Sequence, residues 1–165
     1  MLEKYYNWSG LLVEPSKKFH DDLFKNRSST IDTRCVFSET GRKVTFNEVQ
    51  EGELSTIDSF SNQDSHKKRR AKGIKYDVET ITLEDLLDEY KCPKKIDYLS
   101  IDTEGSEFEI LENFNFKKYS FDIISVEHNF LEPKRSLIKN LLEANGYERA
   151  LPKISRWDDW YFYRH

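Results

Sequence analysis

The sequence is poor in several residue types that mark specialised folds. Its 165 residues include two cysteines, four prolines and one methionine. The cysteines, Cys35 and Cys92, lie far apart and match no metal-ligand spacing, so we expect free thiols in a reducing compartment, the cytoplasm. No apolar run approaches the ~20 residues that cross a bilayer, and the first residues lack the pattern of a secretory signal. The sequence therefore predicts a soluble protein with no membrane partner.

An excess of basic charge is also absent, because 26 lysines and arginines face 30 acidic residues, for a net charge of −4. We therefore do not expect nucleic acid as a partner. The length predicts a single domain, 1–165. Within it, the polar segment 58–75 is predicted to be a mobile loop. This loop holds a cluster of six basic residues, Lys67, Lys68, Arg69, Arg70, Lys72 and Lys75. The cluster could contact phosphate or RNA, but most clusters of this kind are simply exposed to solvent.

What the sequence does contain is an alternation of short apolar runs with helical patterns. The predicted strands cover residues 10–14, 31–37, 43–47, 53–57, 76–82, 96–101 and 121–126. The predicted helices cover residues 16–27, 82–90, 108–116 and 133–145. Two aromatic-rich strands within 147–163 suit an antiparallel hairpin at one sheet edge. This alternation predicts an α/β fold whose central strands are parallel and joined by right-handed crossovers.

The most informative stretch runs from Ile96 to Glu107, where an apolar strand ends in the carboxylates Asp102, Glu104 and Glu107. Ligands of open α/β sheets bind at the carboxyl ends of strands, so these groups are well placed for chemistry. They also suit a second, compatible interpretation in which Asp102 caps a helix and the glutamates favour its N-terminal end. Two more strands end in polar groups, at Glu14 and at residues 127–129. Convergence of these three ends would form one site.

Five blocks of the sequence, in order, resemble the FkbM-type methyltransferases, a branch of the class I enzymes that use S-adenosylmethionine. The blocks are Trp8-Ser-Gly-Leu-Leu-Val-Glu-Pro15, Thr82-Leu-Glu-Asp-Leu-Leu87, Ile96-Asp-Tyr-Leu-Ser-Ile-Asp-Thr-Glu-Gly-Ser-Glu107, Glu127-His-Asn129 and Gly146-Tyr147. Together they span nearly the whole chain. The resemblance implies a Rossmann-like sheet, mostly parallel with an antiparallel C-terminal edge, and S-adenosylmethionine as the cofactor.

The resemblance also implies roles for individual residues. Glu14 is expected to bind the cofactor ribose, because a carboxylate after an early strand can accept hydrogen bonds from both ribose hydroxyls. In most proteins, however, a glutamate before proline is only a turn residue. Ser38 and Glu39 are expected near the adenine, and Asp102 is expected to face the methionine end. The expected acceptor is a hydroxyl of a sugar or another small molecule.

Methyl transfer then needs alignment of the acceptor and removal of its proton. His128 is the first candidate base, since imidazole titrates near neutral pH, but a histidine at a strand end often only orients a loop. Glu104 is a second candidate base, and Asp102 is a further candidate catalytic group. Alternatively, Asp102 and Glu104 together could bind a cation. Two carboxylates without a third clear ligand are a weak metal signal, so no metal site is assigned.

The sequence departs from the family pattern at its start. Family members have a first strand and a glycine-rich turn, but no residues before Leu11 match them, and residues 1–7 are predicted to be the end of a helix. Loss of that central strand would expose two parallel edges. We expect residues 11–13 to pair with residues 98–101, or a second copy or partner chain to cover the edges. A non-catalytic assembly or interaction module is therefore the alternative function, and a nucleic-acid modifier that uses residues 67–75 is a weaker one.

Overall fold

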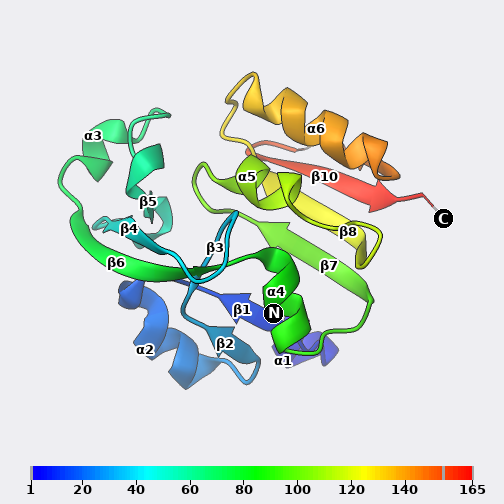
Figure 1. Ribbon diagram of the computed structural model, residues 1–165, viewed down its shortest axis with the longest axis horizontal. Coiled ribbons are helices and arrows are strands. Elements are labelled where there is room, and N and C mark those ends of the chain that lie inside the picture. Colours follow the sequence, from blue (N-terminus) through cyan, green and yellow to red (C-terminus); the bar gives the residue numbers. More distant parts are fainter. Residues whose placement is uncertain (1, 154, 165) are drawn as a thin grey trace.

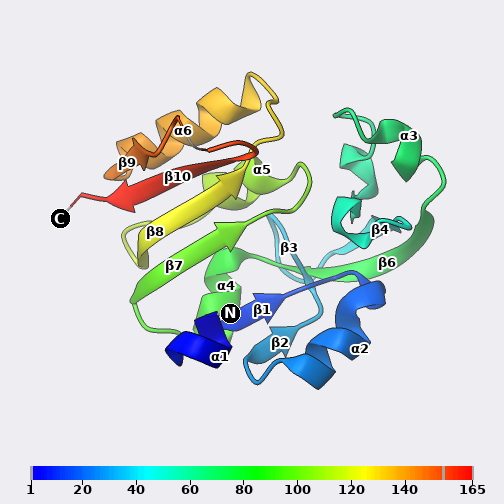
Figure 2. The ribbon, with the colours of Figure 1, turned by 180° about the vertical axis from the view of Figure 1, so that it is seen from behind.

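The computed structural model describes residues 2–153 and 155–164 and shows a mixed α/β protein whose strands form three small sheets (Figures 1 and 2). The α/β class is confirmed. The strands do not, however, form the single mostly parallel sheet that we predicted, because two short parallel strands near the N-terminus are hydrogen-bonded only to each other. A mixed arrangement of sheets is therefore the observed architecture.

The C-terminal sheet carries the predicted antiparallel edge. Its order is β7-β8-β10-β9, formed by β7 (Lys95–Ile101), β8 (Ser120–Glu127), β10 (Asp158–Tyr163) and β9 (Tyr147–Ala150). Strands β7 and β8 are parallel, whereas β10 runs antiparallel to both β8 and β9. Helices α5 (Glu107–Glu112) and α6 (Lys134–Ala144) contribute Leu111 and Leu142 to the core beneath this sheet. The ends of β7 and β8 lie at the same edge, since Ile101, the last residue of β7, pairs with Val126, one residue before the end of β8.

The other two sheets come from the N-terminal half. Strand β1 (Leu11–Val13) pairs in parallel with β2 (Thr30–Asp32). The third sheet has the order β3-β6-β4-β5, formed by β3 (Cys35–Val36), β6 (Ile74–Ile81), β4 (Lys43–Glu48) and β5 (Thr56–Ile57). Only β3 and β6 are parallel in it. The N-terminal half is thus divided between a short parallel pair and a mainly antiparallel sheet.

Two predicted strands are wrong in detail. The strand predicted over 31–37 is split into β2 and β3, because the Asp32 carboxylate accepts a hydrogen bond from the Arg34 backbone N–H at 2.8 Å and turns the chain. The strand predicted over 53–57 begins instead as a 3₁₀ turn, η1 (Gly52–Leu54), and only its last two residues form β5. In both places a local turn replaces strand pairing.

The predicted helices are present. They are α1 (Leu2–Tyr6), α2 (Lys17–Asn26) and α4 (Leu83–Glu89) in addition to α5 and α6. The predicted capping of α4 is confirmed, since the Thr82 hydroxyl accepts a hydrogen bond from the Asp85 N–H at 3.1 Å. Ser16 occupies the N-cap of α2, but its hydroxyl donates to Glu48 instead of capping the helix. The Ser16 hydroxyl thus ties α2 to β4.

The segment predicted as a mobile loop, 58–75, holds a 3₁₀ turn, η2 (Asp58–Phe60), and a short helix, α3 (Lys67–Arg70), before β6 begins. Five residues of its basic cluster are exposed, as the solvated interpretation predicts. Arg70 is the exception, because its side chain is completely buried. Mobility of this segment stays a prediction.

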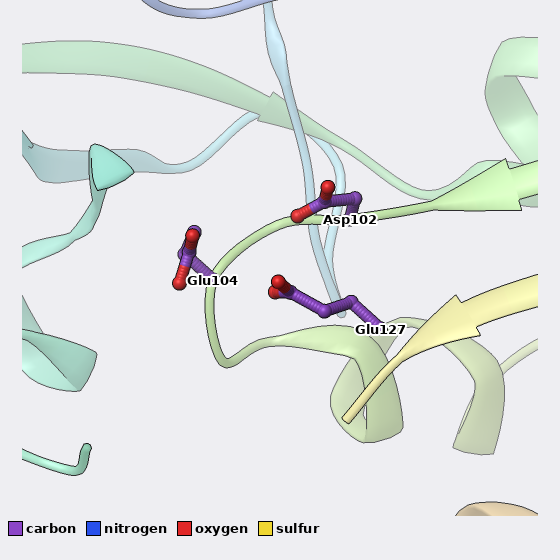
Figure 3. Close-up of side chains that lie close together, drawn as sticks. All are labelled: Asp102, Glu104 and Glu127. Carbon is purple, nitrogen blue, oxygen red and sulfur yellow. The ribbon is translucent and has the colours of Figure 1, made fainter. Parts of the chain in front are cut away.

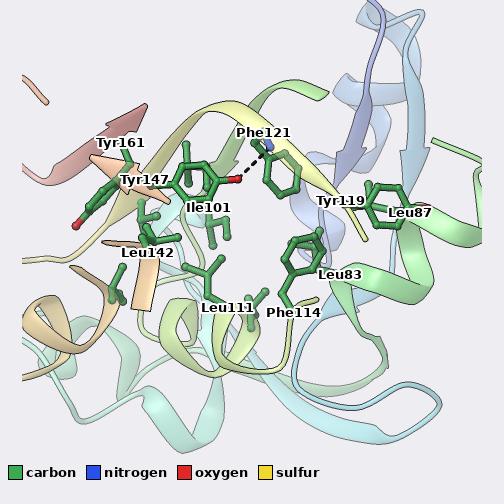
Figure 4. Packing of buried hydrophobic residues seen from close by; sticks show 14 of the residues in the cluster. Leu83, Leu87, Ile101, Leu111, Phe114, Tyr119, Phe121, Leu142, Tyr147 and Tyr161 are labelled. Atoms are coloured by element: carbon green, nitrogen blue, oxygen red, sulfur yellow. Dashed lines mark hydrogen bonds between the residues drawn. The ribbon is translucent and has the colours of Figure 1, made fainter. Parts of the chain in front are cut away.

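The main core packs against the C-terminal sheet (Figure 4). Its central side chains, among them Leu111, Ile124 and Leu142, are fully buried, and the Tyr147 hydroxyl accepts a hydrogen bond from the Phe121 N–H at 3.0 Å. Leu11 and Val13 of β1 pack against the same core. Shared packing therefore holds the carboxyl end of β1 near the ends of β7 and β8 without a hydrogen bond between the two sheets.

Within residues 2–153 and 155–164, β1 bonds only to β2 and β7 only to β8, so each of these two strands has one edge without a partner strand. The pairing predicted between residues 11–13 and 98–101 is therefore not formed. Across the same residues, no helix has both the length and the apolar character needed to cross a bilayer.

Candidate functional site

Three carboxylates meet where β7 and β8 end. Asp102 follows β7, Glu104 lies two residues further on, and Glu127 is the last residue of β8. One carboxylate oxygen from each lies within 4.8 Å of the other two, and the side chains point toward one another (Figure 3). Asp102 and Glu104 were both predicted as site residues. The parallel register of β7 and β8 adds Glu127, because it ends both strands at the same edge.

A tight turn presents Glu104 to this cluster. Glu104 and Gly105 have positive φ values of 57° and 126°, so the chain reverses within two residues. Glu107 stabilises the turn, since its Oε1 accepts hydrogen bonds from the Thr103 N–H and hydroxyl, both at 2.9 Å, and from the Gly105 N–H at 3.0 Å. Helix α5 then begins at Glu107 with Ser106 as its N-cap residue, so Asp102 does not cap it. Asp102 is consequently available to the cluster.

Glu104 is buried and held by two donors. Arg70 Nη2 donates to its Oε2 at 2.8 Å, and Asn129 Nδ2 donates to the same oxygen at 3.0 Å. The guanidinium of Arg70 also binds Asp64 at 2.7 Å and the Leu54 carbonyl at 2.8 Å. Burial raises the pKa of Glu104 to about 7, with the Arg70 charge opposing the rise. Glu104 is therefore fixed in place and easily protonated.

The other two carboxylates differ in access to solvent. Glu127 is buried, and burial followed by repulsion from Asp102 and Glu104 raises its pKa well above the usual range. Asp102 keeps one side open to solvent. The pKa of Asp102 is also raised, first by partial burial and then by repulsion from Glu107. Three acids at such close range repel one another, and Asp102 is the one that a molecule arriving from solvent can reach.

Glu14 lies close to this cluster from the other sheet. Its Oε1 accepts a hydrogen bond from the Ser16 N–H at 2.8 Å, which orients the side chain. Burial raises the pKa of Glu14, and the charges of Glu48 and Asp102 add to the rise. Val13 and Ile101, the last residues of β1 and β7, pack in the same core, so the two strand ends lie near each other. Their convergence on one cofactor stays a prediction.

Ser38 and Glu39 follow β3. Ser38 is half-buried, while the Glu39 carboxylate is exposed and pairs with Arg42 at 3.1 Å. No contact places either residue beside Glu14 or Asp102, so their role near an adenine stays a prediction.

His128 follows Glu127 in sequence but is held by different partners. Its Nδ1 accepts a hydrogen bond from the Phe130 N–H at 2.9 Å, and its Nε2 lies 3.6 Å from Oδ1 of Asp159 on β10. Burial lowers the pKa of His128, so the buried imidazole is neutral near pH 7. A hollow of about 10 Å³ beside His128 and Glu127 has room for about one water. The structure thus gives His128 the surroundings of a loop-orienting residue, and its role as a base stays a prediction.

Comparison with known protein families matches residues 1–149 to the Methyltransferase FkbM domain. The chain belongs to the FkbM methyltransferase family. Neither the curated proteins nor the solved structures include a match to it. Membership implies a methyltransferase that uses S-adenosylmethionine and leaves the acceptor open.

The residues of this FkbM domain fit the cofactor that the family implies. The Glu14 carboxylate is an acceptor suited to ribose hydroxyls, and its orientation is set by the Ser16 N–H. The hollow beside Glu127 holds about one water and is far too small for a nucleoside.

Three residues in or beside the site have contacts that sequence reasoning did not assign. Arg70 was placed in a solvated basic cluster, and nothing in the run of basic residues distinguishes it. Glu127 was recognised at a strand end but given no role, although the register of β7 and β8 places it opposite Asp102. Asp159 belongs to the aromatic tail, where only the pairing of β10 with β8 brings it to His128.

Proposed function

We propose that this FkbM domain transfers a methyl group from S-adenosylmethionine to a hydroxyl of a sugar or another small molecule. The observation that carries the proposal is family membership over residues 1–149. It is supported by the position of Glu14 and Asp102, which directly follow Val13 and Ile101, two residues that pack in one core although their strands belong to separate sheets. In a domain of this family, that pair can bind the two ends of one cofactor molecule. Glu14 would accept the ribose hydroxyls, Asp102 would face the methionine end, and Ser38 and Glu39 would line the adenine.

The cofactor supplies an electrophilic methyl group, so the protein has to align the acceptor and take its proton. A new carbon–oxygen bond forms as the carbon–sulfur bond breaks, and the hydroxyl proton leaves to a base. Asp102 is the accessible carboxylate, and Glu104 lies directly behind it. His128 could serve only after its ring turned away from Asp159 and Phe130. The geometry thus favours the carboxylates over His128 as the groups that meet the acceptor.

We also propose that the first and C-terminal sheets are parts of one Rossmann-like sheet. Both contain a parallel pair, β1–β2 and β7–β8, and Leu11 and Val13 pack on the core that β7 and β8 line. The order would run β2-β1 and then β7-β8-β10-β9, with the antiparallel hairpin at the far edge. In such a sheet, Glu14 and Asp102 would face the same crevice.

Calorimetric titration with S-adenosylmethionine tests the cofactor part of the proposal. The wild-type chain should release or absorb heat on binding and melt at a higher temperature, because a ligand that binds the native state stabilises it by about 2.7 kcal/mol at a hundredfold excess over Kd. Glu14→Gln should weaken binding, whereas Glu112→Gln, at an exposed carboxylate on α5, should not. Absence of heat and of stabilisation at millimolar cofactor would contradict the proposal, and so would equal binding by Glu14→Gln.

One observation favours the alternative function, a non-catalytic assembly or interaction module. The edges of β1 and β7 offer unpaired backbone groups within the described residues, and such edges readily accept a strand from another chain. A chain that binds no cofactor but captures a partner along these edges would support this alternative.

A further inference from the structure

The carboxylate cluster contains more negative charge than its neighbours balance. Arg70 and Asn129 both donate to Glu104, and both use the same oxygen, Oε2. Asp102 has one close polar contact, with Glu127, which is another acid. Arg70 therefore offsets one carboxylate, while the oxygens of the three acids remain within 4.8 Å of one another.

Glu127 provides a second and independent observation. The residue is only 8% exposed, and its Oε2 is buried without a hydrogen-bond donor among residues 2–153 and 155–164. Figure 3 shows the side chain directed at Asp102 and Glu104. A buried carboxylate oxygen with no donor is costly, because the loss of water around it is not compensated. This oxygen therefore indicates a positive group that belongs between the three acids.

We propose that Asp102, Glu104 and Glu127 bind one divalent cation. Its chemical class follows from the ligands, since all three are carboxylates and hard cations such as Mg²⁺, Mn²⁺ and Ca²⁺ prefer oxygen. An ion bound at roughly 2.0–2.6 Å from each oxygen places neighbouring ligand oxygens within about 5 Å of one another, which matches the cluster.

The surroundings suit such an ion. Arg70 and Asn129 both donate to Oε2 of Glu104 and so hold its carboxylate in place without using Oε1. The open side of Asp102 leaves room for water or for an oxygen of a bound molecule. A proton shared between Asp102 and Glu127 is the alternative occupant of the cluster.

The cation would also have a use in catalysis, and that use rests on the proposed function. A hydroxyl oxygen bound to a divalent cation loses its proton more readily, which would prepare an acceptor for methyl transfer. Binding of the cation does not itself depend on methyl transfer, so it can be measured separately.

Titration with Mn²⁺, followed by electron paramagnetic resonance and calorimetry, tests the proposal on the whole chain. We expect one Mn²⁺ per chain, displaced by Mg²⁺ or Ca²⁺. Glu127→Gln, which keeps the shape but removes the charge, should weaken Mn²⁺ binding at least about tenfold. Asp102→Asn should do the same, whereas the exposed control Glu112→Gln should bind like the wild type.

Wild-type chain that binds no Mn²⁺ at millimolar concentration would overturn the proposal and leave the shared proton as the occupant. Equal binding by the wild type and Glu127→Gln would also overturn it. Circular dichroism and melting curves establish whether each variant folds. If Glu127→Gln does not fold, Asp102→Asn replaces it in the test, since Asp102 lies at the open side of the cluster. Titration with S-adenosylmethionine is run separately, so Mn²⁺ binding without cofactor binding would support the cation site and contradict the methyltransferase proposal.

Discussion

Arg70 and Glu104 form a buried ion pair that connects the β3-β6-β4-β5 sheet to the carboxylate cluster, with Nη2 of Arg70 2.8 Å from Oε2 of Glu104. Arg70 ends α3, just before β6, and Glu104 follows β7. The Arg70 side chain is fully buried and pairs with Asp64 as well. One arginine thus links the segment 58–75 to the turn that carries the candidate site.

Replacement of this arginine should be costly. Arg70→Met would leave the buried carboxylates of Glu104 and Asp64 without their partner, and loss of one member of a buried ion pair typically costs about 3–5 kcal/mol. Urea denaturation measures this loss of stability. The neighbouring variant Arg69→Met is the control, because Arg69 is exposed and its pairing with Glu51 is longer, at 3.7 Å. An equal, small effect of both variants would show that the ion pair contributes little.

The turn after β7 should not tolerate a side chain at Gly105. With φ at 126°, Gly105 has a backbone conformation that other residues rarely adopt, and a Cβ atom there would lie 3.2 Å from Cβ of Phe60. Gly105→Ala should destabilise the protein by about 1–3 kcal/mol and displace Glu104. Thermal melting measures the first effect. Gly10→Ala is the matched control, since Gly10 has an ordinary φ and open space around it, and a similar loss in both variants would contradict the explanation.

Asp159 should make stability depend on acid pH. Burial by itself would raise its pKa, but hydrogen bonds from Arg135 and the nearby charges of Arg135 and Arg149 lower it overall. A lowered folded-state pKa adds stability above the unfolded value of about 3.9, and this stability is lost as pH falls through the folded-state pKa. Asp159→Asn should therefore cost about 1.5–3 kcal/mol at neutral pH.

The difference between wild type and Asp159→Asn should stay constant above about pH 5 and shrink below about pH 4. Melting temperatures of both proteins across this range provide the measurement. A gap that persists unchanged to the lowest pH at which both fold would mean that the charge of Asp159 is not what stabilises the native state.

The unpaired edges of β1 and β7 should promote self-association. Among the described residues these edges have no partner strand, and exposed edges of this kind tend to pair with another copy. Size-exclusion chromatography with light scattering should give a mass above the 19.7 kDa of one chain. A single, concentration-independent species at the monomer mass would contradict this expectation.

Much of the local structure could be predicted from the sequence. The apolar runs that end at Val13, Ile101 and Val126 all form strands, because short apolar segments between turn residues are best buried in sheets. The Thr82 cap of α4 follows from residue types three positions apart. The family, too, was readable from ordered motifs, since these contain the residues that shape strand ends.

The pairing of strands could not be predicted in the same way. Residues 31–37 alternate as a strand should, yet a hydrogen bond from the Arg34 N–H to the Asp32 carboxylate divides them between two sheets. The short strand β1 pairs only with β2, although its apolar residues would equally suit a neighbour on each side. Hydrogen-bonded partners are chosen by the whole fold, and hydrophobic pattern alone does not select among them.

The amino-acid sequence by itself determined which residues build strands and helices and which carboxylates stand at the strand ends, because periodicity, caps and turn residues act over a few positions. Only the tertiary structure decided that Glu127 joins Asp102 and Glu104, that Arg70 is buried against Glu104, and that His128 faces Asp159. These contacts join residues that are more than twenty positions apart in the chain. Their formation depends on the register of β7 and β8 and on burial in a shared core, which no local pattern encodes.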